Sequence, residues 1–383
     1  MAGRRGGGVK VALVHDWLTG TRGGEKVLRE LARLFPEAPL YTLFHFPGSV
    51  PAEVEAREVR TTWLQRVVSP RRDYRSLLPL YFLACESWDL SGFDLVLSTS
   101  HCVAKAAKRG PRAFHLCYCH TPVRYLHDQF DDYLRGRGAL ARAAARLVRA
   151  PLRARDVATV PRVDAFLANS ENVRERIARL YRRPARVVPA PVDDRFYAPA
   201  PRERKGLLVV SALAPYKRVD DAIAASARLG LPLTVAGFGP EERRLRALAG
   251  ANVTFAGSPS DEELRELYRS AELVLMPGEE DFGIVPLEAQ ACATPVVALG
   301  KGGALETIVD GATGVLYPSP GPEHLARAID LARSTRFDGA RLVANAARFS
   351  EAAFRARFLD AARAALLEAG RSDLAEGLPR AEP

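Results

Sequence analysis

Two glutamates, Glu280 and Glu288, bracket a phenylalanine–glycine turn in the second half of the chain. The run reads EDFGIVPLE and lies between an apolar strand predicted at 273–277 and an apolar helix predicted at 284–292. A strand, a glycine turn and a helix start leave free backbone amides at the end of a sheet, where anions bind. A carboxylate accepts hydrogen bonds from vicinal hydroxyls. These features together suit a ligand that is phosphate at one end and polyol at the other. A capped helix with two solvated glutamates would give the same sequence pattern without a ligand.

The residues around this pair extend the pattern. The run from Glu280 to Val297 resembles the Glu-x7-Glu motif and its flanks in family 4 retaining glycosyltransferases of GT-B fold. The resemblance implies that Glu280 holds the hydroxyls of a donor sugar and that Glu288 binds a ribose diol. It also implies that the amides of Phe282, Gly283 and Ile284 stabilise a departing diphosphate.

A glycine pair stands between the first predicted strand and the first predicted helix. Gly23 and Gly24 would let the backbone approach a phosphate closely, and a tight turn would use the same residues. In the family a Gly-Gly pair here faces the donor diphosphate, so the resemblance assigns both residues to donor binding. The preceding run His15-Asp16-Trp17 also matches relatives and is expected near the acceptor.

A basic position follows the first strand of the second half. Lys217 matches a family lysine that binds the donor phosphates, but Ala212 stands five residues earlier where the family has an arginine. The resemblance therefore implies that Lys217 neutralises more of the phosphate charge than usual, or that another residue such as Arg22 contributes.

His120 lies at the end of a strand predicted at 113–118, and relatives place a histidine here against the donor sugar. We therefore expect His120 and Glu280 to be catalytic. Cys117 and Cys119 share one face of this strand because side chains alternate. Their spacing with the nearby histidines fits no common zinc pattern, so we expect buried thiols and no metal.

The composition is that of a globular protein. The chain has 383 residues, of which 48% are hydrophobic and 26% charged, so two or three domains are expected. No apolar run reaches the length of a membrane span, and the N-terminus lacks the apolar core of a signal peptide. Five cysteines, an odd number, suit reduced thiols and a cytoplasmic setting.

Short apolar strands alternate with amphipathic helices in two halves, which predicts parallel sheets covered on both faces. We expect an α/β protein with two Rossmann-like, doubly wound domains. The first, 1–190, would be the acceptor side, and the second, 191–345, would hold the nucleotide sugar. The resemblance implies that a C-terminal helix at 346–370 crosses back to the first domain. A disordered tail is expected at 371–383.

The positive charge is confined to the first half. Residues 1–190 hold 32 Lys and Arg against 18 Asp and Glu, whereas the remainder is slightly acidic. Arginines gather at 134–155 and 66–75, interleaved with apolar residues. Two interpretations stay open: peripheral contact with an anionic membrane at the inner face of the cell, or solvated basic faces. Nucleic acid is not expected, since no binding module or aromatic platform accompanies the arginines.

The resemblance covers Val9 to about Leu367 and is greatest to bacterial O-antigen and exopolysaccharide enzymes, mannosyltransferases among them. It implies transfer of a sugar from a nucleotide diphosphate sugar, with GDP-mannose the first donor to try, to a lipid-linked or saccharide acceptor. No cofactor is expected besides this co-substrate. A nucleotide-sugar 2-epimerase of the same fold, or a non-catalytic nucleotide-sugar-binding member, are the alternatives.

Overall fold

The computed structural model describes residues 8–20, 23–69, 77–128, 130 and 138–380. Within these ranges the chain forms two compact units. The first comprises the described residues up to 130, then 138–190 and 352–380, and the second comprises 191–351. Each unit is described by itself below.

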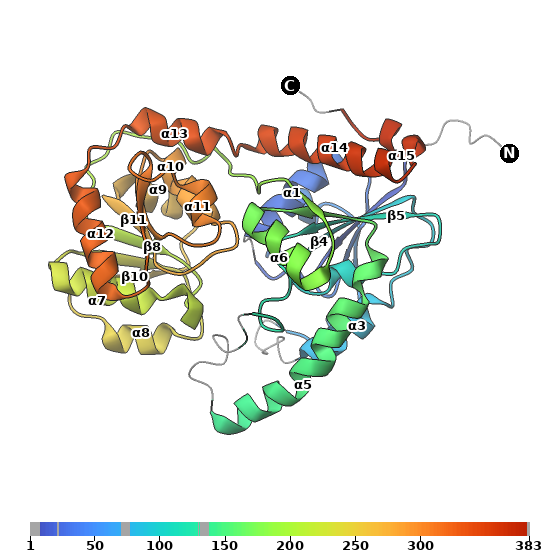
Figure 1. The fold of residues 1–383 in the computed structure, drawn as a ribbon, viewed down its shortest axis with the longest axis horizontal. Helices are drawn as coiled ribbons and strands as arrows, with labels where there is room; N and C mark the ends of the chain where they lie inside the picture. Colours follow the sequence, from blue (N-terminus) through green and yellow to red (C-terminus); the bar gives the residue numbers. More distant parts are fainter. Residues whose placement is uncertain (1–7, 21–22, 70–76, 129, 131–137, 381–383) are drawn as a thin grey trace. The chain divides into compact units, whose positions relative to one another are not determined.

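The first unit is built on a seven-stranded sheet in which every neighbouring pair is parallel (Figure 1). Its central strands are buried along their whole length, because helices cover both faces. In spatial order the strands are β3 (Val59–Thr61), β2 (Leu40–Thr42), β1 (Val11–His15), β4 (Leu95–Ser100), β5 (Phe114–Cys119), β6 (Ala165–Ala168) and β7 (Ala185–Val187). The α-helices are α1 (Gly23–Leu34), α2 (Ala52–Glu55), α3 (Leu78–Cys85), α5 (Ala139–Ala158), α6 (Glu171–Tyr181), α14 (Glu351–Glu368) and α15 (Ser372–Glu376).

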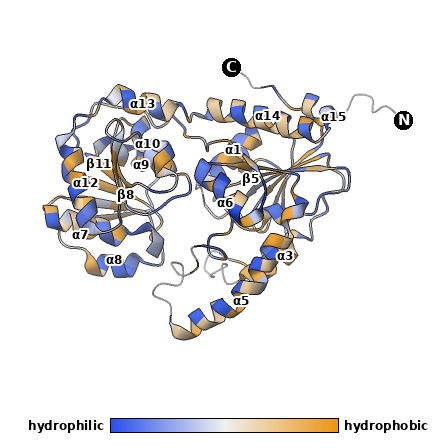
Figure 2. Ribbon diagram, viewed as in Figure 1, coloured by the Kyte–Doolittle hydropathy of each residue, from blue (hydrophilic) through white to orange (hydrophobic). Residues whose placement is uncertain are grey.

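The second unit contains a six-stranded sheet, also parallel throughout. Hydrophobic residues concentrate along the strands, while the helices carry both kinds of residue (Figure 2). The spatial order is β10 (Val253–Gly257), β9 (Leu233–Ala236), β8 (Leu207–Val210), β11 (Leu273–Met276), β12 (Val296–Leu299) and β13 (Gly314–Tyr317). Its α-helices are α7 (Val219–Leu229), α8 (Glu242–Leu248), α9 (Asp261–Ser270), α10 (Ile284–Ala291), α11 (Ala304–Thr307), α12 (Pro322–Ser334) and α13 (Gly339–Ala347).

Both sheets are doubly wound, which confirms the predicted fold class. In each sheet the chain adds strands outward on one side of its first strand and then returns to add the others on the opposite side. The order therefore reverses between β1 and β4 in the first unit and between β8 and β11 in the second. Loops leaving these strand pairs diverge, so the carboxyl ends at these two points are where ligands bind in such sheets.

Helix α14 packs into the first unit, although it comes last but one in sequence. Phe354 is buried and meets Tyr118 of β5 edge-on, with ring centroids 5.9 Å apart. Arg355 donates from Nη1 to Oε2 of the buried Glu30 on α1, at 2.5 Å. An aromatic contact and an ion pair thus join the end of the chain to the first sheet and its first helix.

The expectation of a disordered tail is wrong for the part of it that the structure describes. Residues 372–376 form helix α15, and Leu374, Ala375 and Leu378 are buried. A Cβ on Gly377 would lie 2.3 Å from the Val9 side chain, so the tail packs directly against the start of the chain. Three apolar residues within a polar stretch were a weak pattern, and they are ordered by burial against distant residues.

None of the helices in the described ranges is long and apolar enough to cross a membrane.

We expect Phe354→Ala to destabilise the first unit by about 3–5 kcal/mol, the usual cost of emptying a buried aromatic site. Leu367→Ala, on the same helix but 57% exposed, should change stability by less than about 0.5 kcal/mol. All three tryptophans, at positions 17, 63 and 88, lie in this unit. Tryptophan fluorescence during urea unfolding therefore measures its stability selectively. Equal effects of the two variants would contradict the packing described for α14.

Candidate active site

Three histidines meet at the carboxyl edge of the first sheet. His15 ends β1, His101 follows β4 and His120 follows β5, and these three strands are neighbours in register. The ring centroids of His101 lie 6.0 Å from those of His15 and 6.4 Å from those of His120. The sheet therefore brings together histidines that lie up to 105 positions apart in the sequence. They meet at the point where the strand order reverses.

The predicted glycine pair begins helix α1 beside this cluster. A Cβ on Gly24 would lie 3.6 Å from Nε2 of His120 and 3.6 Å from Cε1 of His15. Any larger residue would fill the space between the two imidazoles. Gly23 is the first residue of the helix, so amides of its first turn lie at the same edge. Arg22, the alternative phosphate ligand, lies outside the described residues.

Burial and like charges act on His120. Burial lowers the pKa of its imidazole well below the usual value, and His101 and His15 lower it further. The Nε2 atom of His120 is buried and has no hydrogen-bond partner among the residues that the structure describes. His120 is thus a neutral imidazole whose Nε2 is a buried ring nitrogen without a hydrogen bond to any described residue.

Glu25 of helix α1 supplies the negative charge of this edge. It is 4% exposed, and its Oε1 lies 3.8 Å from Nε2 of His15. Burial alone would raise the pKa of Glu25, but the interaction with His15 and the charge of His101 outweigh it and lower this pKa. Glu25 is therefore ionised and orients His15, whose Nδ1 is hydrogen-bonded to Oγ1 of Thr99 at 2.6 Å.

Asp16 organises the loop after β4. Its fully buried carboxylate accepts four hydrogen bonds, of 2.6–2.9 Å, from the consecutive main-chain amides of His101, Cys102, Val103 and Ala104. Its Oδ2 also lies 3.1 Å from Nδ1 of His101, whose side chain is 31% exposed. Nδ1 of His101 is therefore the ring nitrogen that donates to the carboxylate.

Trp17 sets the plane of the His101 ring. The two rings meet edge-on, at a centroid distance of 4.6 Å and an angle of 86°. Trp17 is half-buried and lies parallel to the buried Phe44, with centroids 6.1 Å apart. Sequence analysis singled out Trp17 and Asp16 but missed His101, since no local motif surrounds it.

In the second unit, Lys217 and Glu280 form an ion pair through Nζ and Oε1. Lys217 ends a turn that follows β8, and Glu280 follows β11, so the two strands are those between which the order reverses. A Cβ on Gly278 would lie 2.7 Å from Cα of Lys217, so this glycine allows the two loops to touch. The side chains stay 15% and 20% exposed, respectively. The structure thus brings both predicted residues together at the predicted edge.

The turn between the two glutamates starts helix α10. Gly283 has φ of +85°, a conformation that other residues avoid, and Ile284 is the first helical residue. Phe282 is buried against Phe349, with centroids 5.9 Å apart. The start of α10 therefore presents its first amides beside Glu280, as the motif predicts.

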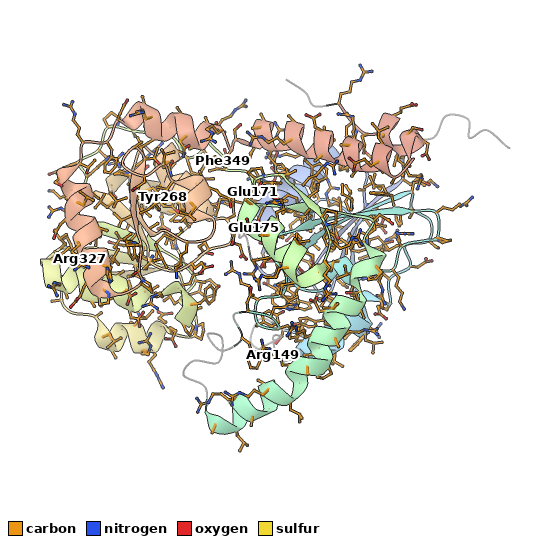
Figure 3. The ribbon with its side chains drawn as sticks, in the orientation of Figure 1. Arg149, Glu171, Glu175, Tyr268, Arg327 and Phe349 are labelled. Atoms are coloured by element: carbon orange, nitrogen blue, oxygen red, sulfur yellow. The ribbon has the colours of Figure 1, made fainter. Side chains whose placement is uncertain are left out.

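Glu288 lies differently from Glu280. It is 3% exposed, and its Oε2 accepts a hydrogen bond of 2.7 Å from the hydroxyl of Tyr268, which is labelled in Figure 3. The sequence motif pointed to Glu288 but gave no sign of Tyr268. This tyrosine fixes the rotamer of Glu288 from inside the unit.

A second glycine loop packs on Glu280. Gly303 donates its N–H to the carbonyl of Glu280 at 2.8 Å, and a Cβ on it would lie 2.2 Å from the Phe282 oxygen. Lys301, two residues earlier, is exposed. The run 300–307 therefore packs on the Glu280 backbone through Gly302 and Gly303.

The residues that could replace the missing arginine are few. Ala212 is exposed after β8, at the same edge as Lys217. Arg218 has φ of +53° and donates from Nε to Oδ2 of Asp221 at 2.7 Å. Arg218 is therefore directed at its own helix. Lys301 is the residue before Gly302, which pairs with Glu280 in a parallel bridge.

No group of three or more His, Cys, Asp or Glu in the described ranges is placed to hold a metal ion. All five cysteines are free and buried. Burial raises the pKa of the Cys117 thiol to about 12. Cys117 and its neighbour Cys119 on β5 serve as core residues, with Cys117 fully protonated at neutral pH.

We expect Asp16→Asn to destabilise the first unit by about 3 kcal/mol or more, because an amide nitrogen would face main-chain donors that have lost their acceptor. His101→Ala retains the carboxylate and its four amide contacts, so its cost should stay below about 1 kcal/mol. Urea unfolding followed by tryptophan fluorescence measures both. If the alanine variant were the less stable, the loop would depend on the imidazole instead.

Comparison with known proteins agrees with both units. A model of glycosyltransferase family 4 matches residues 21–196, and a model of group 1 glycosyl transferases matches residues 193–353. A D-inositol 3-phosphate glycosyltransferase of Mycobacterium tuberculosis is 37% identical over 153 residues. That alignment takes in 37% of this chain and 30% of the relative, so the chain spans about a third of the length of the curated relatives it matches.

Solved structures match nearly the whole chain. Sucrose-phosphate synthase from Thermosynechococcus elongatus has a TM-score of 0.71 at 18% identity, over 94% of this chain and all of that one. HepE of Anabaena, in complex with UDP-glucose, gives 0.71 at 18% identity, over 93% of this chain and all of its own. At these identities the likeness concerns the fold. With the two family models spanning residues 21–353, the chain belongs to family 4 of the glycosyltransferases and has the GT-B fold.

Proposed function

We propose that this protein is a retaining glycosyltransferase that moves a sugar, mannose as the first candidate, from a nucleotide diphosphate sugar to a lipid-linked or saccharide acceptor in cell-surface glycan synthesis. The observation that carries the proposal is the Lys217–Glu280 pair beside the start of α10, at the strand-order reversal of the second sheet. A cation and amides suit a diphosphate, and a carboxylate suits the hydroxyls of a sugar.

The second unit would hold the donor. Glu288, fixed by Tyr268, binds the ribose diol, and Glu280 holds the sugar hydroxyls. Lys217 and the amides of 282–284 stabilise the diphosphate as it leaves. A bound diphosphate competes with Glu280 for Lys217, so donor binding exchanges one charge-assisted contact for another. Because charge on the diphosphate grows in the transition state, these contacts strengthen as the glycosidic bond to phosphate breaks.

In the first unit, the residues proposed to act in the reaction are His120 and the glycine pair. The proposal assigns the amides of Gly23 and Gly24 to the diphosphate and His120 to the sugar. The depressed pKa of His120 keeps its imidazole neutral near pH 7. A lone pair on Nε2 stabilises positive charge that develops on the sugar ring, whereas an imidazolium would oppose it. Burial therefore gives His120 the charge state that an oxocarbenium-like transition state needs.

The reaction is proposed to need no metal or other cofactor. The chain contains no Asp-x-Asp sequence, the usual metal clamp of the other main transferase fold. Lys217 is the cation for the leaving group. Lys301 is a second one, since the adjoining Gly302 and Gly303 pack on the Glu280–Phe282 backbone. This lysine would offset the alanine at position 212.

The acceptor is proposed to meet His101. Its ring is partly exposed and is held in place by Asp16 and Trp17, and in the neutral form with Nδ1–H on Asp16 its Nε2 would be a hydrogen-bond acceptor. A hydroxyl that donates to Nε2 would be oriented as a nucleophile. The protein would act in the cytoplasm, peripherally at the inner face of the cell membrane.

A panel of GDP, UDP, GDP-mannose and UDP-glucose tests the donor site by thermal shift. A ligand that binds only the folded state raises the melting point by mass action, so one nucleotide and its sugar should do so. UDP-glucose is included because HepE binds it. Lys217→Ala should weaken binding about 10- to 100-fold, the effect of losing a hydrogen bond to a charged group, and Lys301→Ala by less. Lys205→Ala, at an exposed lysine of the same unit, is the control.

No shift with any of the four ligands would defeat the donor site. A donor converted to its C2 epimer without acceptor would favour the epimerase. Full glycan synthesis in cells that carry Glu280→Ala or His120→Ala would favour a non-catalytic member.

Two histidine variants separate the donor and acceptor roles. With octyl α-mannoside or D-inositol 3-phosphate as acceptor, His120→Ala should lower both transfer and donor hydrolysis by about 100-fold or more. His101→Ala should lower transfer alone, because water needs no orientation by Nε2. Released nucleoside diphosphate, measured with and without acceptor, gives both rates. Parallel loss of hydrolysis in His101→Ala would remove its assignment to the acceptor.

A further inference from the structure

Helix α5 contacts its own unit along a single line. Over twenty residues its inward positions are Ala145, Arg149, Leu152 and Asp156, spaced by four, three and four. The other α5 side chains that the structure describes are exposed. Figure 1 shows the N-terminal end of α5 standing away from the sheet of its unit.

This inward line is firmly anchored. Arg149, labelled in Figure 3, donates to the carbonyls of Leu126 and His127 and lies 4.3 Å from the centre of the Phe130 ring. Buried Asp156 pairs with Lys105 and with His127, each at 2.8 Å. The helix is thus held rigidly at its C-terminal half, while its outer face stays uncovered.

The outer face is apolar. At 100° per residue, Leu140 and Leu147 lie about 20° apart and roughly opposite the inward line. They are 89% and 79% exposed. The small or apolar residues Ala143, Ala144 and Pro151 share this side and are exposed too. Exposed leucines on a regular helix face indicate a surface that another apolar medium covers.

Arginines lie along one flank of the helix, about 100–140° round its axis from Leu147. Arg142, Arg146 and Arg153 recur at spacings of four and seven and are exposed. They make no ion pair with any residue in the described ranges. The one acidic residue of the helix is Asp156, which is buried and already paired. This flank of α5 therefore carries a net positive charge that no residue in the described ranges neutralises.

Helix α3 extends the surface. Leu152 of α5 packs on the core cluster that holds Tyr81 and Phe82 of α3, and Arg155 is hydrogen-bonded to Glu86 at the end of α3. The two helices lie side by side in Figure 1. Leu83 on α3 is 60% exposed. Of the other basic stretch, Arg71, Arg72 and Arg75 lie outside the described residues, as do Arg135 and Arg137 before α5.

We propose that the outer face of α5 docks on a bilayer surface rich in anionic phospholipid. An apolar strip beside arginines is the pattern of a helix that lies in the membrane interface, with leucines among the acyl chains and guanidinium groups at the phosphates. A second copy of the chain fits less well, since pairing two such faces brings like charges together. The inference rests on the proposed function only in that a lipid-linked acceptor would be met at this surface.

Co-sedimentation of the full chain with vesicles tests the proposal. Binding should be at least tenfold tighter to vesicles of equal phosphatidylglycerol and phosphatidylcholine than to phosphatidylcholine alone, and 0.5 M NaCl should weaken it. The triple variant Arg142→Gln, Arg146→Gln, Arg153→Gln should bind the anionic vesicles about 100-fold more weakly, at roughly fivefold per arginine. Leu140→Ser with Leu147→Ser should weaken binding at least tenfold.

The control pair is Leu331→Ser with Arg327→Gln, exposed residues of helix α12 in the second unit, and it should bind like the parent. Equal affinity for both vesicle types, or equal loss in the control, would overturn the proposal. So would a dimer that Leu140→Ser with Leu147→Ser converts to monomer, since α5 would then cover a second copy. No donor is present in this assay, so a protein that fails to bind nucleotide sugar can still bind the vesicles. A protein that fails to bind the vesicles can likewise still bind the donor.

Discussion

The order of parallel strands in each sheet is the constraint on which the chemistry of this protein depends. A parallel sheet sends every strand out at the same edge, and its loops part where the winding reverses. The reversal lies between β1 and β4 in one unit and between β8 and β11 in the other. Residues that end these strands therefore meet however far apart they are in sequence, and the two clusters of polar side chains at these edges follow from the topology.

Electrostatics then assigns different tasks to the two edges. In the second unit a charged pair, Lys217 and Glu280, remains partly exposed, so its charges can be exchanged for those of a ligand. In the first unit burial and neighbouring histidines hold the imidazole of His120 neutral. One edge thus suits growing negative charge on a leaving diphosphate, and the other suits positive charge on a sugar. Under the proposed function, Ala212 would remove one cation from the diphosphate side, and Lys217 would neutralise more of its charge.

Sequence patterns predicted what local periodicity controls. Buried strands such as β4 and β5 were recognisable as apolar runs, whereas Lys217, Glu280 and His120 were assigned from the family resemblance at positions that follow such runs. Strands of three residues, such as β2 and β7, carry too little pattern to be seen. Asp16 and His101 show the deeper limit. The partners of the Asp16 carboxylate are main-chain amides 85 to 88 residues away, and an amide has no sequence signature. The hydrogen bond between Tyr268 and Glu288 was missed for a similar reason. The sequence does not distinguish a buried tyrosine that binds a carboxylate from one that only packs in the core.

The uneven charge of the chain also acquires a physical interpretation. Many arginines of the first unit are internal connectors: Arg57 donates to the carbonyls of Phe35 and Ala38, Arg162 to Ala106 and Arg183 to Asp164. A planar group with five donors is well suited to such carbonyls, which satisfy its N–H groups inside the unit. These residues raise the formal charge of the unit without creating a basic surface. Arg142, Arg146 and Arg153 are different, because they are exposed on one flank of α5 and form no ion pair with a described residue. A count of basic residues alone therefore does not distinguish arginines that bind carbonyls inside the unit from the exposed arginines of α5.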